Sequence, residues 1–189
     1  MLNVDVFGGI AAVDSRNAGS LALSRAGQEL LGCLVLVAAD RPLRREALAE
    51  MLWPDCDLDA SRQRLRSALW RLRRSLGSGL RAAVCHDGDR VWCDRSHLAP
   101  LPHARFAETI ETCCAGPVEA MTAEDFRRLD AALELYAAPV MDGFDSTWIL
   151  PHRERFAELY CRGLERQITW YRTHGNPEAT IRAGRTLLR

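Results

Sequence analysis

The stretch from Asp57 to Gly77 constrains this chain most, because its apolar and basic residues separate onto different faces of one helix. At 100° per residue, one stripe collects Leu58, Ser61, Leu65, Ala68, Leu69, Leu72 and Leu76. Arginines lie on both flanks of this stripe: Arg62, Arg66 and Arg73 on one, Arg64 and Arg71 on the other. Gln63, Ser67, Trp70 and Arg74 point away from it. The pattern predicts an amphipathic helix with one buried face.

The outer surface of this helix carries charge of one sign. From Ala60 to His86 the sequence has seven arginines and no acidic residue. Solvated helix faces usually mix charges, because Glu–Arg pairs four residues apart stabilise the helix. A polyanion across the surface explains why such pairs are missing. The pattern favours a nucleic-acid surface; the alternative is a solvated helix, or one that docks on an acidic protein.

Composition describes an ordinary globular chain. Its 189 residues are 48% hydrophobic and 26% charged, with a formal net charge of zero, and all 25 basic residues are arginine. Seven cysteines without a disulfide-type spacing fit a reducing cytoplasm. We expect no signal peptide, and the apolar run Leu30–Ala39 is too short to span a membrane.

The first 98 residues alternate between short strand-like and helical patterns. Residues 2–24 predict three short strands, with a polar turn at Asp14–Gly19. Helices follow at about 25–39, capped by Ser24 and ended near Asp40, and at 44–53, stopped by Pro54. Beyond the basic helix, residues 80–85 and 90–93 flank an Asp-Gly turn typical of a hairpin. This order predicts a winged helix-turn-helix over residues 1–98.

The remaining residues, 99–189, predict a helical domain. After a short linker at 100–102, helices are expected at 103–114, 123–136, 151–174 and from Pro177 onward, with a loop at 137–150. The junction "GNPEAT" between the last two is typical of stacked tetratricopeptide-type hairpins. The fold class is therefore mainly α with small β-sheets: an N-terminal winged helix-turn-helix followed by a tetratricopeptide-like helical domain.

Several stretches resemble one known family. RPLRREALAEMLWPD, ASRQRLRSALWRLRRSLG and DGDRVWCD look like the DNA-binding half of SARP-type bacterial transcriptional activators. AALELYAAPVMDGFDSTWILPHRERFAELY and HGNPEATIRAGRTLL resemble their bacterial transcriptional activator domain. The resemblance implies a regulator that binds double-stranded DNA at promoter repeats, often as a side-by-side dimer, and contacts RNA polymerase. Family members usually continue beyond the equivalent of Arg189, so we expect this chain to be truncated.

The candidate DNA-binding residues fall into two groups. Arg62, Gln63, Arg66 and Ser67 occupy the N-terminal outer half of the helix, which usually reaches base edges. The expected phosphate contacts are Arg64, Arg71, Arg73 and Arg74 on the helix and Arg90 on the wing, a role for which Arg81 and Arg95 compete. Trp70 is open to three interpretations: packing under the wing, which we favour, contact with a thymine methyl, or contact with a polymerase subunit.

Other sites are weaker. Cys85, His86, Cys93 and His97 lack zinc-ligand spacing, and we expect no metal, no cofactor and no catalytic set. The apolar loop residues Phe144, Trp148 and Ile149 are expected to pack back onto helix 123–136. The last helix should leave an apolar end, around Ile181, Leu187 and Leu188, that self-associates or binds further helices.

Overall fold

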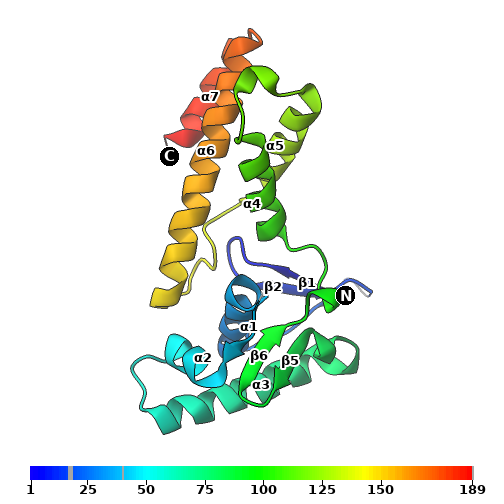
Figure 1. The fold of residues 1–189 in the computed structure, drawn as a ribbon, viewed down its shortest axis with the longest axis vertical. Coiled ribbons are helices and arrows are strands. Elements are labelled where there is room, and N and C mark those ends of the chain that lie inside the picture. Colours follow the sequence, from blue (N-terminus) through cyan, green and yellow to red (C-terminus); the bar gives the residue numbers. More distant parts are fainter. Residues whose placement is uncertain (17–18, 40, 189) are drawn as a thin grey trace.

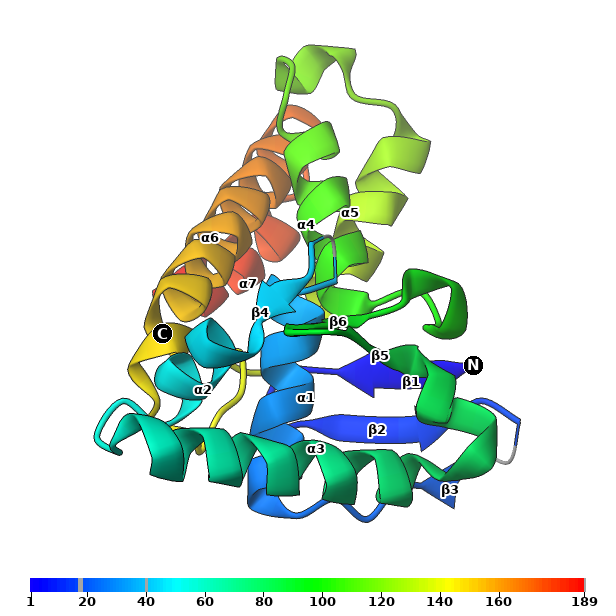
Figure 2. The same cartoon turned by 60° about the horizontal axis from the view of Figure 1, so that its bottom comes forward.

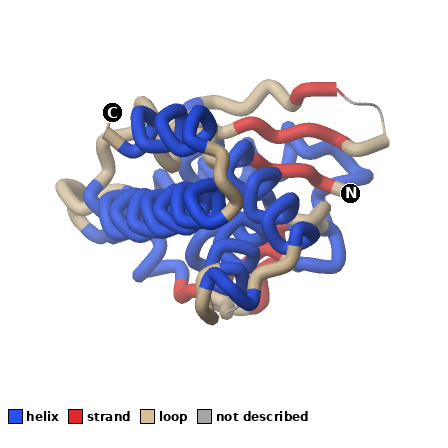
Figure 3. The backbone as a smooth tube through the Cα atoms, turned by 90° about the horizontal axis from the view of Figure 1, so that it is seen from above, coloured by secondary structure: helices blue, strands red, loops and turns tan. Residues whose placement is uncertain are grey.

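A computed structural model describes residues 1–16, 19–39 and 41–188. The chain begins with a three-stranded antiparallel sheet, in the order β1 (Leu2–Asp5), β2 (Ala11–Asp14) and β3 (Gly19–Ser20). In Figure 3 these strands lie side by side at one edge of the molecule. Three strands were predicted here. The expected turn at 14–19 includes residues 17 and 18, which lie outside the described residues. Residue 40, where the following helix was expected to end, lies outside them as well.

Three helices and a second sheet complete the N-terminal half. The helices are α1 (Arg25–Val37), α2 (Arg45–Leu52) and α3 (Leu58–Leu80). The sheet pairs β4 (Leu43–Arg44) with β6 (Arg90–Cys93) and β6 with β5 (Val84–Asp87), all antiparallel. Ser24 caps α1 by accepting a hydrogen bond from the Gly27 amide, as predicted. Strand β4 was not predicted, because two residues carry no periodic signal.

The C-terminal half is helical: α4 (Pro102–Cys113), α5 (Ala123–Leu135), α6 (Leu150–Thr173) and α7 (Pro177–Leu187). The structure also contains short 3-10 turns at η1 (Arg81–Ala83), η2 (Arg95–His97), η3 (Val118–Ala120) and η4 (Thr147–Ile149). Thr122 and Asp125 form a capping box at the start of α5. Helix α6 packs closely on α4 and α5, since a Cβ at Gly163 would lie 2.8 Å from Ile110 and Leu133. The predicted bounds of the α-helices agree with the structure to within about three residues.

The two halves share one continuous apolar core. Phe7, just after β1, inserts its ring among Phe106, Tyr136 and Phe156, with centroid distances of 5.4, 5.1 and 5.5 Å. Residues 98–101 follow β1 instead of forming a free tether, because Ala99 donates to the Leu2 carbonyl and Leu101 is buried. The division at residue 98 stays a prediction.

The loop between α5 and α6 returns to the N-terminal half. Val140 forms a bridge with Phe7, and the Met141 amide donates to the Val6 carbonyl over 2.7 Å. Phe144 lies beneath the Arg25 guanidinium, 4.5 Å from the ring centroid. Its predicted packing on helix 123–136 is therefore wrong: the loop's backbone pairs with the segment after β1, and this pairing brings Phe144 to α1. Trp148 is half-buried with its ring edge toward His152.

At the two ends of the longest axis of the molecule, which is vertical in Figure 1, lie α4–α7 and the helices α2 and α3, respectively. Helix α1 and the strands β1 and β2 lie between them. This arrangement leaves α3 at a free end of the molecule. No helix in the described part of the chain is long and apolar enough to cross a membrane.

Candidate nucleic-acid interface

Helix α3 lies across the free end of the molecule, with its whole length presented in Figure 2. The predicted stripe holds it to α1 and α2: Ser61, Leu65, Ala68, Leu69, Leu72 and Leu76 are all buried. Leu58 is the exception, with 54% of its surface exposed. Its predicted burial is wrong because the first turn of α3 stands in solvent, where Asp57 and Asp59 are exposed as well.

Both ends of the helix follow from local sequence. Asp57 Oδ1 accepts a hydrogen bond from the Ala60 amide over 2.8 Å, and Asp59 adds negative charge to the first turn. Regular helix stops at Gly77, whose φ of +66° and ψ of −177° suit glycine. The chain then makes another helical turn to Leu80. The predicted stretch, Asp57 to Gly77, therefore matches the regular part of this helix together with its N-cap and the glycine that ends it.

The four residues predicted to read bases are brought to one surface. Arg62, Gln63 and Arg66 are exposed and Ser67 is half-buried. Arg66 donates to Gln63 Oε1 over 3.4 Å, so the two side chains lie together. Arg62 differs from the expectation of an unpaired arginine face, because it forms ion pairs with Glu46 of α2 and with Asp59. Of the two arginines predicted to read bases, Arg66 is therefore the one without an ion pair to an acidic side chain of the described residues.

The predicted phosphate contacts divide between two places. Arg71 and Arg74 are exposed and Arg73 is half-buried on the C-terminal half of α3. Arg64 is also exposed, but it lines a cleft of about 370 Å³ between the α2–α3 turn and the loop around Phe144. The structure thus separates Arg64 from the other arginines of the group.

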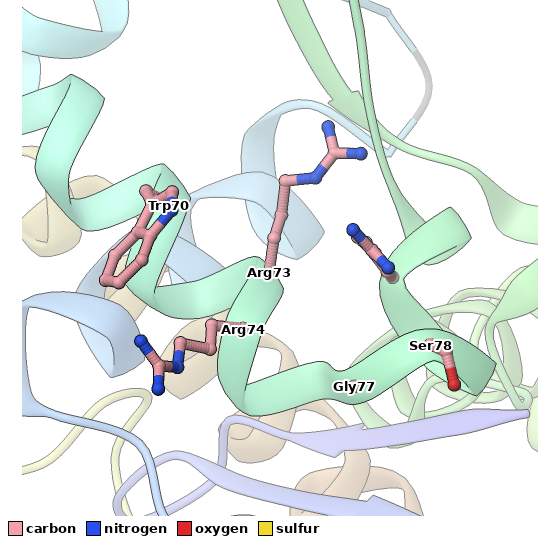
Figure 4. A pocket seen from close by; sticks show the side chains of 6 residues that line it. Trp70, Arg73, Arg74, Gly77 and Ser78 are labelled. Atoms are coloured by element: carbon pink, nitrogen blue, oxygen red, sulfur yellow. The ribbon is translucent and has the colours of Figure 1, made fainter.

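Trp70 does not pack under the wing, so our favoured interpretation is wrong. Its side chain is 60% exposed, and the Arg74 guanidinium lies 5.2 Å from its ring centroid. The wing strands instead pair with β4 and contact α1, which leaves this face of α3 open. Figure 4 shows the resulting concavity of about 330 Å³, lined by Trp70, Arg73, Arg74, Gly77, Ser78 and Arg81.

The wing is the predicted hairpin of β5 and β6, with Gly88 at a φ of +54° in its turn. Arg90 is exposed at the start of β6, between the acidic Asp87 and Asp89 turn and the rest of the strand. Arg44 of β4 is its direct cross-strand partner. Sequence reasoning missed Arg44 as a candidate, because nothing in the pattern placed it beside the hairpin.

The candidate zinc residues are not gathered into a site. Cys93 is buried, and burial raises the pKa of its thiol to about 12. Cys85 lies on the opposite strand and donates to the Ala82 carbonyl. His97 contacts Asp94 and Ser96 instead. Across the described ranges, no three His, Cys, Asp or Glu side chains are placed to hold a metal ion.

Comparison with known proteins rests on structure alone. No family model matches the sequence, and no curated protein matches it. The fold is similar to that of Mycobacterium tuberculosis EmbR, solved in complex with a low-affinity phosphopeptide, with a TM-score of 0.66 at 17% sequence identity. The match covers 98% of this chain and 58% of the EmbR chain. This chain therefore shares, over almost its whole length, the fold of part of the EmbR chain.

Proposed function

We propose that this protein is a sequence-specific DNA-binding transcriptional regulator. In this proposal the N-terminal half works as a winged helix-turn-helix and the C-terminal half as a tetratricopeptide-like activator domain. The observation that carries the proposal is the outer face of α3, where Gln63, Arg66, Trp70 and Arg74 are exposed and no acidic residue follows Asp59 before Asp87. The shared fold with EmbR supports it.

The N-terminal half of α3 enters the major groove, which is wide enough to admit one helix. Arg66 then donates two hydrogen bonds to a guanine, and Gln63 pairs with an adjacent adenine edge. In the free protein Arg66 donates to Gln63 Oε1, and this contact supports a common position for the two side chains on the outer face of α3. Arg62 reaches a base only by leaving Glu46, so its contribution is reduced by the loss of that ion pair.

The wing holds the neighbouring backbone. Arg44 and Arg90 lie side by side on β4 and β6 and both are exposed. Contacts from such residues to phosphates fix the register of a protein on DNA without reading sequence. Asp87 on β5 is the cross-strand partner of Arg90, so its carboxylate lies on the same face of the sheet and reduces the positive charge that Arg90 offers a phosphate.

The SARP resemblance adds the partners and the direction of regulation. We propose that the protein activates transcription, binds promoter repeats as a homodimer through the end of the helical half, and contacts RNA polymerase. We propose no enzymatic activity. The alternative is a helical interaction module whose basic helix docks on an acidic protein.

Selection of binding sites from a randomised duplex library tests the proposal. We expect one sequence to be enriched. For that sequence, the slope of log Kd against the logarithm of the salt concentration should be about 0.9 for each phosphate neutralised. Arg66→Ala should weaken binding to that sequence by about 10- to 100-fold, in line with about 1–3 kcal/mol for a bidentate base contact. Its matched control is Arg162→Ala, an exposed arginine on α6 in the helical half and outside the proposed dimer end. If no sequence is enriched and no duplex binds, the interaction-module alternative replaces this proposal.

A further inference from the structure

Helix α3 is too long for the groove it is proposed to enter. Its regular part, from Leu58 to Leu76, spans about 28 Å at 1.5 Å per residue. The major groove of B-DNA is about 12 Å wide. The groove winds around the duplex, whereas the helix is straight. With the first half of α3 in the groove, the second half therefore leaves the groove and passes over the sugar–phosphate backbone.

The second half continues the face that reads bases. Trp70 and Arg74 follow Gln63 and Ser67 at intervals of three, four and seven residues, so all four share one face of the helix. Trp70 is 60% exposed and stacked on Arg74, a contact that holds the guanidinium in place. The exposed indole and the guanidinium together present a flat apolar surface beside a positive charge. A sugar next to a phosphate offers the complementary chemistry.

The break at Gly77 gathers more positive charge around this tryptophan. Because Gly77 turns the chain, Arg81 comes to line the same concavity as Arg73 and Arg74 (Figure 4). Arg16, in the turn after β2, also lies close to this region. Its Nη1 atom is 3.8 Å from the position that a Cβ on Gly79 would occupy. These residues come from α3, η1 and the N-terminal sheet. None of the four arginines forms an ion pair with an acidic side chain of the described residues.

We propose that this concavity, the flank pocket, holds the sugar–phosphate backbone of duplex DNA beside the sequence that α3 reads. This inference rests on the proposed function. Arg73, Arg74 and Arg81 contact phosphate oxygens, and Trp70 lies against the deoxyribose between them. Arg16 adds a phosphate contact from the N-terminal sheet. The flank pocket therefore extends the DNA site beyond the bases read, and it is indifferent to the flanking sequence.

The test combines protein variants with duplexes of two lengths. Both duplexes carry the selected sequence; one ends at its edge, and the other continues for about ten base pairs on each side, a full helical turn. Wild-type protein should bind the long duplex about 10-fold more tightly. Trp70→Ala and Arg81→Ala should each lose about 5- to 10-fold on the long duplex and little on the short one. Arg81→Ala should also make the salt slope shallower by about 0.9.

A neutral backbone locates the contact. Single methylphosphonate linkages placed along the flank should weaken wild-type binding at the phosphates that the arginines contact. At the position contacted by Arg81, the same linkage should have no effect on Arg81→Ala. Arg81→Lys should restore the salt slope, because it keeps the charge. Arg162→Ala again serves as the control. Library selection with Trp70→Ala should enrich the same sequence as wild type.

Three results would overturn the flank pocket while leaving the proposed function in place. Wild type could select a sequence yet bind long and short duplexes equally. The variants could lose affinity equally on both duplexes, or Trp70→Ala could select a different sequence, which would make Trp70 a base reader. A protein that selects no sequence would overturn the proposed function itself.

Discussion

His103 is a buried histidine at the junction of the two halves. It is 6% exposed at the start of α4, and its Nδ1 atom has no hydrogen-bond partner among the described residues. Burial, with smaller repulsion from His152, Arg95 and Arg155, lowers its pKa to about 4. The folded protein therefore holds this imidazole neutral, whereas the unfolded chain binds a proton below about pH 6.5.

This difference predicts acid sensitivity. Stability from the neutral imidazole is fully present above pH 6.5 and is lost as the pH falls toward 4, because the unfolded state then binds more protons. Between pH 7 and pH 5 we expect the free energy of unfolding to fall by about 2 kcal/mol through His103. Urea unfolding of wild type and His103→Leu at both values measures it. The variant should lose less between the two values, and an equal loss would contradict the assignment to His103.

Single residues also mark what the sequence could not predict about the site. Helical spacing was enough to place Gln63, Arg66 and Arg74 on the outer face, because it depends on one element only. The pairing of Arg62 with Glu46 depends on how α2 meets α3, and the gathering of Arg81 and Arg16 depends on the turn at Gly77 and on the N-terminal sheet. Contacts between elements leave no periodic signal in the sequence.

Among the elements, the loop between α5 and α6 depends on one side chain. Arg153 donates from Nε to the Val140 carbonyl over 2.8 Å, and from Nη2 to the Met141 and Phe144 carbonyls over 2.6 and 2.7 Å. Val140, Met141 and Phe144 are buried, so water cannot easily replace these bonds. One guanidinium thus holds the loop against β1 and α1.

Removing that guanidinium should be costly. Arg153→Met is expected to lower the free energy of unfolding by about 3 kcal/mol, because three carbonyls lose a charged donor. Arg153→Lys should recover only part of it, since an ammonium lacks the planar fork. The matched control is Arg155→Ala, two residues away, whose half-exposed pair with Glu111 is worth about 0–1 kcal/mol. Chemical denaturation compares the three variants, and equal losses for Arg153→Met and Arg155→Ala would contradict this role.

Elements differ in how well the sequence predicts them. The helices were predicted because local signals mark their ends. Ser24 accepts the expected capping hydrogen bond at the start of α1, and in the structure Asp57 and Thr122 cap α3 and α5 in the same way. Strand β4 and the loop's pairing with the segment after β1 were missed. Both are formed by two or three residues whose partners lie 46 or more positions away, as with Arg44 and Arg90. Their hydrogen bonds, not a pattern of side chains, define them.

At the scale of the whole molecule, the shared core couples the proposed reading helix to the helical half. Phe7 connects them through its three aromatic neighbours. The loop around Val140 adds a second connection, because Val140 forms a bridge with Phe7 itself. Because one continuous apolar core runs through both halves, unfolding one half would expose the buried side chains of the other to water. The molecule should therefore unfold as one cooperative unit.

Phe126 provides the test, because it lies in the helical half away from this junction. It is half-buried and stacks on Trp170, with ring centroids 5.1 Å apart. Phe126→Ala should cost about 2 kcal/mol, below the usual 3–5 for a fully buried phenylalanine. If the molecule is one unit, native-state hydrogen exchange should show the most protected amides of α3 losing the same free energy as those of α6. Phe7→Ala, at the junction, should lower both by about 3–5 kcal/mol. Lost protection in α6 with α3 unchanged in Phe126→Ala would show instead that the halves unfold independently, and that the core shared through Phe7 does not couple them.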